Sequence, residues 1–228
     1  MENKRIWEID LLRAVAIILM ATFHTVFDLN QFIGIDLDYQ SGFWYWLGKA
    51  SALAFIFLAG VSSGFSKNTV RRGIKVLAFA MAITIVTYIF FKEQYIRFGI
   101  LHFLGTSMII FPVLKRMNNY LLLTSAVIIA FTAIPLKNIL SDTSLLLPFG
   151  VMYQGFATFD YYPLIPYLSV FILGVLAYKM YYYKKRSLFK FRFENSGISM
   201  ISNNSLAIYL IHQPIIVVTI LGFNTLLN

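Results

Sequence analysis

The stretch Ile9–Leu29, which reads IDLLRAVAIILMATFHTVFDL, decides the fold of this chain. A helix needs about 20 mostly apolar residues to cross the hydrocarbon core of a bilayer, and this stretch has that length. It is too long for the apolar core of a signal peptide, and no small-residue cleavage site follows it. We therefore expect a retained membrane-spanning helix at the start of the chain.

The composition of the whole chain is that of a membrane protein. Of its 228 residues, 59% are hydrophobic and 13% are charged, and the mean hydropathy is +0.72. A typical soluble domain has about 25% charged residues, so the surplus of apolar side chains must face lipid. The chain has no cysteine, which excludes disulfides, a thiolate nucleophile and a cysteine-ligated metal.

Six further stretches are apolar enough to span a bilayer. They are 44–65, 74–91, 97–114, 120–136, 163–183 and 204–224. We predict an all-α polytopic integral membrane protein of about seven transmembrane helices, with 1–228 forming a single domain. The segment 145–156 is too short to span and is either re-entrant or interfacial.

Lysine and arginine residues lie mainly on one side of these helices. Of the 19 such residues, fourteen lie on the side of the N-terminus, and two lie inside helices. The fourteen are Lys4, Arg5, Lys67, Arg71, Arg72, Lys75, Lys115, Arg116, Lys179, Lys184, Lys185, Arg186, Lys190 and Arg192. The opposite side has Lys92, Arg97 and Lys137. Because cytoplasmic loops carry the excess of positive charge, we expect a cytoplasmic N-terminus, and the net charge of +9 indicates topology rather than nucleic-acid binding.

Four ionisable residues of the first predicted helix share one face: Asp10, Arg13, His24 and Asp28. At about 100° per residue they fall in a stripe about 60° wide, and Arg13 and His24 are about 16 Å apart along the axis. Ionisable side chains are costly in lipid and usually face the protein interior. This polar stripe must therefore line a cavity or pack on polar partners. For Asp10 and Arg13, an ion pair that joins helices is an equally good explanation.

His24 is the strongest candidate for catalysis or proton handling. Asp28 follows it at i+4, where a carboxylate can orient an imidazole or raise its basicity. His102 in the fourth predicted helix and His212 in the last are candidates for lining the site, although each could be structural. The histidines lack the two-histidine helical spacing of a zinc site, so we expect no metal.

Small and basic residues mark the predicted cytoplasmic end of the second helix. The small residues are Gly60, Ser62, Ser63 and Gly64, and they permit close helix packing or the approach of a ligand. The basic residues that follow are Lys67, Arg71, Arg72 and Lys75, and they either set topology or bind phosphate groups from the cytosol.

Asp160 lies at the predicted outer surface, just before Pro163 and Pro166. There it could meet a polar acceptor. It could instead cap the sixth helix, since Asp before a first-turn proline is a favourable helix start.

Four stretches carry a family resemblance: Arg5–Met20 with Phe23–Leu29, Phe57–Gly64, Phe159–Tyr167 with Phe171–Leu176, and Ser205–Pro214. In that order they resemble the transmembrane acyltransferase superfamily, and most of all bacterial relatives of heparan-alpha-glucosaminide N-acetyltransferase. The spacing of ten residues between Arg13 and His24 is similar to the mark of the related O-acyltransferase branch. Ala14 stands where that pattern usually has glycine.

The resemblance implies an acetyl-CoA-dependent membrane acyltransferase. It would move an acetyl group from cytosolic acetyl-CoA to an amine or hydroxyl of an extracytoplasmic sugar or glycan. The implied catalytic residue is His24. From the residues themselves, we expect Asp28 and Asp160 to assist it by orienting His24 or the acceptor, and Asp10, His102 and His212 to line the site. We expect acetyl-CoA to be bound by Arg13, Ser62, Ser63, Lys67, Arg71 and Arg72. The implied location is multi-pass in a bacterial cytoplasmic membrane, and a homodimer is one possible assembly.

Two other classes of function use the same features. A small proton-coupled transporter would use the polar stripe as a conduction path, but the sequence lacks the internal repeat that transporters often show. A non-catalytic membrane scaffold would be indifferent to substitution of His24. For an acyltransferase, the sequence leaves open whether His24 acts as a general base or carries the acetyl group itself.

Overall fold

The computed structural model describes residues 6–136, 138–191, 193 and 195–227. Four basic residues of the topology count, Lys4, Arg5, Lys137 and Arg192, lie outside them. The described chain is mainly helical, with two very short strands, and six of its helices are long and apolar enough to cross a membrane. The prediction of an all-α polytopic membrane protein is therefore confirmed.

The chain divides into two compact units, one of 1–55 with 185–228 and one of 56–184. The first unit contains α1 (Trp7–Asp28), α7 (Ser196–Asn203) and α8 (Ser205–Leu227). It also contains the first part of α2 (Gly42–Ser63), since the boundary falls after Phe55. A single turn of π-helix, Leu29–Ile33, extends α1.

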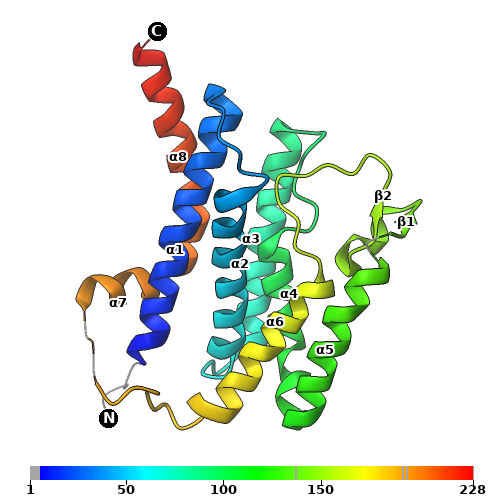
Figure 1. The fold of residues 1–228 in the computed structure, drawn as a ribbon, viewed down its shortest axis with the longest axis vertical. Coiled ribbons are helices and arrows are strands. Elements are labelled where there is room, and N and C mark those ends of the chain that lie inside the picture. The colour runs from blue at the N-terminus through cyan, green and yellow to red at the C-terminus, as the bar shows by residue number, and fades with distance from the viewer. Residues whose placement is uncertain (1–5, 137, 192, 194, 228) are drawn as a thin grey trace. The chain divides into compact units, whose positions relative to one another are not determined.

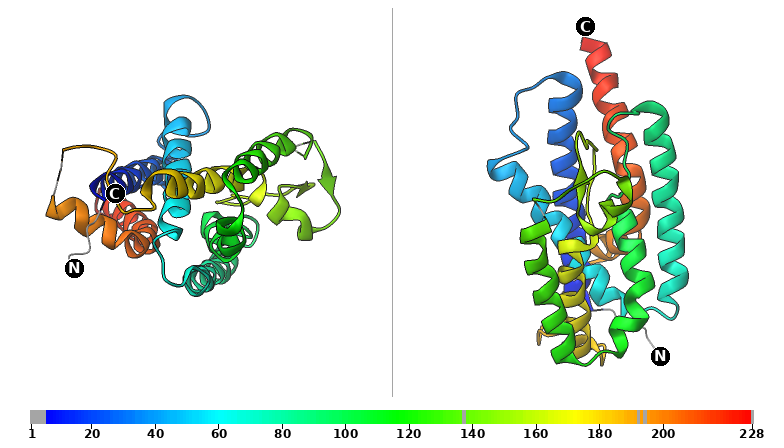
Figure 2. Two further views of the ribbon diagram at one scale, coloured as in Figure 1. Left: turned by 90° about the horizontal axis from the view of Figure 1, so that it is seen from below. Right: turned by 90° about the vertical axis from the view of Figure 1, so that its right-hand side faces the viewer.

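In the first unit, α1 packs against both α7 and α8, and Figures 1 and 2 show α1 and α8 running side by side. The α1–α2 contact is close, because a Cβ added at Gly48 would overlap the Phe23 ring. Ser51 Oγ also donates a hydrogen bond to the Ala16 carbonyl at 2.9 Å. The short helix α7 was missed, since its sequence had been assigned to a connection.

The second unit contains the rest of α2 and four further helices. These are α3 (Thr69–Phe90), α4 (Ile100–Arg116), α5 (Asn119–Leu136) and α6 (Leu164–Ala177), with α6 extended by a π-helical turn at Tyr178–Tyr182. Here α3 packs on α4, and α5 packs on α6 (Figure 2). The predicted span 97–114 corresponds to α4, whose 17 residues measure about 25 Å. One face of α4 is buried along its whole length.

Close contact between α2 and α6 depends on two glycines. A Cβ added at Gly60 would overlap the carbonyl oxygen of Phe171, and one added at Gly174 would overlap the carbonyl oxygen of Phe57. The small residues at this end of α2 therefore serve helix packing, the first of the two roles expected of them.

The long connection between α5 and α6 contains no spanning element in its described part. It contains a 3-10 turn, Ser144–Phe149, flanked by two strands of two residues each, β1 (Leu140–Ser141) and β2 (Met152–Tyr153), paired in parallel. The prediction that 145–156 does not span is confirmed.

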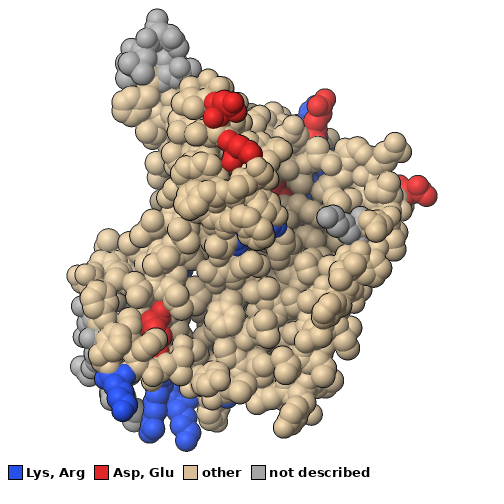
Figure 3. All heavy atoms as spheres, in the orientation of Figure 1, with Lys and Arg blue, Asp and Glu red and all other residues tan. Residues whose placement is uncertain are grey.

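Apolar side chains are exposed along the outer helices. Ile89 and Phe90 on α3 and Ile128 and Phe131 on α5 are each more than 60% exposed. On the face drawn in Figure 3, charged side chains are few and most of the surface is uncharged. Such surfaces require lipid rather than water around them.

Candidate functional site

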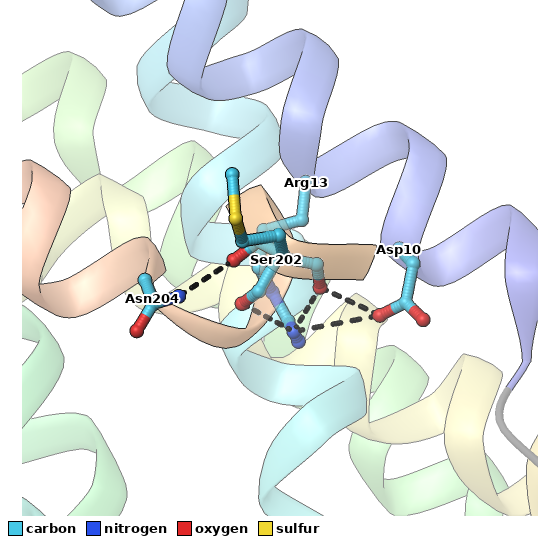
Figure 4. Close-up of polar contacts among 5 residues, drawn as sticks. Asp10, Arg13, Ser202 and Asn204 are labelled. Carbon is cyan, nitrogen blue, oxygen red and sulfur yellow. Dashed lines mark hydrogen bonds and ion pairs between the residues drawn. The ribbon is translucent and has the colours of Figure 1, made fainter. Parts of the chain in front are cut away.

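The N-terminal end of the polar stripe joins α1 to α7 (Figure 4). Ser202 Oγ donates a hydrogen bond to Asp10 Oδ1 at 2.6 Å and accepts one from Arg13 Nη1 at 2.8 Å. The Arg13 and Asp10 side chains are 4.0 Å apart, and Asp10 is buried. A serine between an acid and a base satisfies both, which is the geometry of a link between helices.

The C-terminal end of the stripe meets two polar residues of α8. The ring centroids of His24 and His212 are 4.8 Å apart. One turn further along α1, Asp28 Oδ1 accepts a hydrogen bond from Gln213 Nε2 at 2.7 Å. Asp28 is fully buried. The stripe thus packs on polar partners, one of the two arrangements expected for it.

Four polar atoms of this α1–α8 cluster are buried and unsatisfied. Within the described part of the chain, His24 Nδ1, His212 Nε2, Asp28 Oδ2 and Gln213 Oε1 have no hydrogen-bond partner. A buried polar atom without a partner costs about 1–3 kcal/mol. A ligand that supplied hydrogen-bond donors would relieve this cost at Asp28 Oδ2 and at Gln213 Oε1.

The tautomer of His212 follows from its hydrogen bond. His212 Nδ1 is 2.6 Å from the carbonyl oxygen of Tyr209. Because a carbonyl oxygen only accepts, Nδ1 carries the hydrogen, and Nε2 of the neutral ring carries the lone pair. The free nitrogen of His212 is therefore a proton acceptor.

Aromatic rings lie against the two imidazoles. Phe23 and Phe27 lie edge-on to the His24 ring, at 5.6 Å and 6.5 Å between centroids. The Tyr209 ring lies 5.4 Å from that of His212. Apolar surroundings strengthen the electrostatic interactions between the polar groups among them.

The relation between Asp28 and His24 differs from the i+4 arrangement expected. The Asp28 carboxylate bonds Gln213, and among the described residues His24 Nδ1 is without a partner. The carboxylate is therefore fixed to α8, and the imidazole lies beside a second imidazole.

His102, in the second unit, has both ring nitrogens occupied. Nδ1 accepts a hydrogen bond from the Gly99 amide at 3.2 Å. Nε2 is 3.1 Å from Thr84 Oγ1, whose hydroxyl donates to the Ile96 carbonyl at 2.7 Å. Nε2 must therefore be the donor to Thr84. These bonds fix the start of α4, so the geometry fits the structural alternative for His102.

Asp160, also in the second unit, caps a helix other than the one expected. Its Oδ2 accepts a hydrogen bond from the Ile100 amide, at the start of α4, at 2.8 Å. The residue before α6 is Pro163, and no side chain caps that helix. Asp160 therefore stabilises α4, not α6.

The loops around Asp160 hold each other in place. The Phe159 amide donates to the Gln94 carbonyl and the Tyr162 amide to the Phe98 carbonyl, both at 3.0 Å. Tyr161 donates its hydroxyl to the Leu147 carbonyl at 2.8 Å, and burial raises the pKa of Tyr161 to about 12. Tyr161 thus stays a donor at neutral pH, and this end of the second unit is tied together.

The corner between α2 and α3 exposes its basic side chains. Lys67, Arg71 and Arg72 are exposed, and Asn68 Oδ1 caps α3 by accepting from the Arg71 amide at 3.0 Å. Ser63 is buried, and its hydroxyl donates to the Ala59 carbonyl at 2.8 Å. The basic side chains are accessible to a ligand, whereas the Ser63 hydroxyl is already used in a hydrogen bond within α2.

Among the described residues, no three His, Asp or Glu side chains gather closely enough to hold a metal ion. The α1–α8 cluster itself can offer proton transfer, nucleophilic attack by a nitrogen, and hydrogen bonding.

A comparison with protein families decides the identity of this fold. Residues 5–214 match the model described as heparan-alpha-glucosaminide N-acetyltransferase, catalytic. The chain belongs to this family. Comparisons with curated proteins and with solved structures found no match. The matched region covers both compact units and contains His24, Asp28, His212 and Gln213.

Two residues of this heparan-alpha-glucosaminide N-acetyltransferase family member were missed from sequence. Gln213 had a signal, because it is a polar residue next to His212 inside an apolar span. Ser202 had none, since serines are common in connections and only the fold brings this one to Asp10.

Proposed function

We propose that this chain transfers an acetyl group from cytosolic acetyl-CoA to an amine or hydroxyl of an extracytoplasmic sugar or glycan. The match of residues 5–214 to the acetyltransferase family carries the proposal. The α1–α8 cluster supports it, because that cluster combines two imidazoles with buried, unsatisfied oxygens next to aromatic rings.

The cluster fits the acceptor substrate. Asp28 Oδ2 and Gln213 Oε1 are both hydrogen-bond acceptors, so each needs a donor. A sugar presents hydroxyl or amine hydrogens at close spacing. An acceptor bound to these two oxygens would have its nucleophilic atom held close to the imidazoles, as proximity catalysis requires.

His24 then removes the proton of the acceptor. The freed nitrogen or oxygen attacks the thioester carbonyl, the carbon–sulfur bond breaks, and CoA leaves as the thiolate and takes up a proton. General-base help of this kind contributes about 10²–10⁴ in rate. In the alternative route, His24 attacks the thioester first and carries the acetyl group to the acceptor.

The basic corner of the second unit fits the other substrate. Lys67, Arg71 and Arg72 are all exposed within six residues of sequence. Guanidinium groups bind phosphates through paired hydrogen bonds. By the positive-inside rule this corner and the N-terminus face the cytosol, where acetyl-CoA is available. Ser62 and Arg13 remain further candidates for binding acetyl-CoA. We expect the protein to lie in a bacterial cytoplasmic membrane.

The direct test uses the purified full chain in proteoliposomes with acetyl-labelled acetyl-CoA. The acceptors are a glucosamine-terminated oligosaccharide and its N-acetylated form, which offers hydroxyls alone. We expect labelled oligosaccharide by mass spectrometry with wild type, and a loss of at least about 10²-fold with His24→Gln.

The control is Thr22→Val, since Thr22 is exposed and its hydroxyl donates to the Ile18 carbonyl of its own helix, α1. Transfer by His24→Gln at the wild-type rate, with the protein folded, would rule out a chemical role for His24. No transfer by wild type to amine or hydroxyl acceptors would overturn the proposed function.

A further inference from the structure

His212 has the geometry of a second reacting imidazole. Its Nδ1 is bound to a backbone carbonyl, its Nε2 is buried with no partner among the described residues, and its ring is 4.8 Å from that of His24. A histidine that serves only packing has its nitrogens occupied, as His102 does in α4. His212 has one nitrogen fixed and the other left free.

Two imidazoles at this distance hold one proton more readily than two. Two positive rings would repel each other strongly in apolar surroundings. A single added proton avoids that repulsion, so the pair can take up one proton during the reaction and leave one ring neutral. The neutral ring is a base, and the protonated ring is an acid.

The carbonyl of Tyr209 decides which ring keeps the proton. It accepts from His212 Nδ1 at 2.6 Å, and a hydrogen bond to an acceptor stabilises the charged imidazolium more than the neutral ring. His24 Nδ1 has no such acceptor in the described residues. A proton added to the pair is therefore held better by His212 than by His24.

We propose that His212 is a catalytic acid that protonates the departing CoA sulfur, while His24 is the base that deprotonates the acceptor. This inference rests on the proposed function. The acceptor proton moves to His24, the new bond to the acetyl carbon forms, and the carbon–sulfur bond breaks. The proton passes from His24 to Nε2 of His212, and the departing sulfur takes it from there. Both rings are then neutral again, so the pair as a whole gains and loses none.

The test compares two acetyl donors in His24→Gln, His212→Gln and wild type. The donors are acetyl-CoA and the acetyl thioester of 4-nitrothiophenol, whose thiolate is stable enough to leave without a proton. With acetyl-CoA we expect His212→Gln to lose about 10²–10⁴ in kcat, with the KM for acetyl-CoA changed little. With the aryl thioester we expect His212→Gln to lie within about tenfold of wild type, while His24→Gln stays inactive with both donors.

Thr219→Val on α8 is the matched control, because Thr219 is exposed and its hydroxyl donates to the Ile215 carbonyl of its own helix. The inference is overturned if folded His212→Gln keeps at least half of the wild-type kcat with acetyl-CoA, or if it loses as much with the aryl thioester as with acetyl-CoA. If wild type does not accept the aryl thioester, the kcat of His212→Gln with acetyl-CoA is compared with that of wild type, provided that the two proteins have the same melting temperature. That comparison alone then decides whether the inference stands. Wild type inactive with acetyl-CoA and every acceptor would instead contradict the proposed function, so the two failures are distinguishable.

Discussion

Gln213 on α8 donates its side-chain amide to the buried carboxylate of Asp28 on α1 across 2.7 Å. This bond orients both side chains. It holds one carboxylate oxygen and leaves the other, Oδ2, without a partner among the described residues, and it leaves the amide oxygen of Gln213 equally free. The two helices are thus joined by a bond that also orients two free acceptors in the cluster beside His24.

Removing this bond should loosen α8 from α1. Gln213→Leu keeps the side-chain volume but leaves Asp28 with no donor, so we expect a loss of about 1–2 kcal/mol of stability. For a chain of this length that lowers the melting temperature by about 2–8 °C. Thermal unfolding of the detergent-purified protein measures it, with Thr219→Val as control. A melting temperature equal to that of wild type would mean that Asp28 is satisfied in another way.

The link between α1 and α7 makes a similar prediction at the other end of the polar stripe. Ser202→Ala removes the hydroxyl that bonds both Asp10 and Arg13. We expect a loss of about 1–3 kcal/mol, because Asp10 is buried and loses the hydrogen bond that Ser202 donates to it. Ser199→Ala, in the same helix, is the matched control. Equal melting curves for the two variants would show that the link contributes nothing measurable.

Much of this fold could be predicted because spanning a bilayer is a local property of sequence. The apolar lengths of all seven predicted stretches correspond to helices, with ends shifted by a few residues. The helix α7 could not be predicted this way. It has only eight residues, and it is stabilised by its contact with α1 rather than by its own composition.

Sequence could predict which residues lie in the site better than it could predict their hydrogen-bond partners. Helical spacing correctly placed His24 and Asp28 on one face, but it cannot show that Gln213 from another helix would compete for the carboxylate. His102 could have been interpreted as a capping residue, since it stands three positions after Gly99 at a helix start. Capping was one of the two roles expected of Asp160, and only the fold shows that the capped helix is α4 and not α6.

Asp160 offers a way to separate capping from catalysis. The carboxylate accepts from the Ile100 amide at 2.8 Å, and asparagine caps helices as well as aspartate does. We expect Asp160→Asn to keep the melting temperature of wild type and Asp160→Ala to cost about 0.5–2 kcal/mol. Acetyl transfer by folded Asp160→Asn should stay close to wild type. A loss of about 10²-fold or more in that variant would instead assign the carboxylate a chemical role.

The basic corner predicts how acetyl-CoA stabilises the protein. A ligand at 100 times its Kd adds about 2.7 kcal/mol to stability, so acetyl-CoA should raise the melting temperature in a saturable way. Arg71→Ala/Arg72→Ala removes two exposed guanidinium groups, and each charged hydrogen bond is worth about 1.5–3 kcal/mol. We therefore expect the Kd for acetyl-CoA to rise by about tenfold or more, while the melting temperature without ligand changes little.

The matched control removes the same charge from the same unit. Lys115 and Arg116 are also exposed, in the last turn of α4, so Lys115→Ala/Arg116→Ala should leave the Kd within about threefold of wild type, because screening weakens charges that do not contact the ligand. If both double variants weaken binding equally, general positive charge rather than a phosphate site attracts acetyl-CoA. If neither does, the arginines act only in topology, and the donor binds elsewhere on the chain.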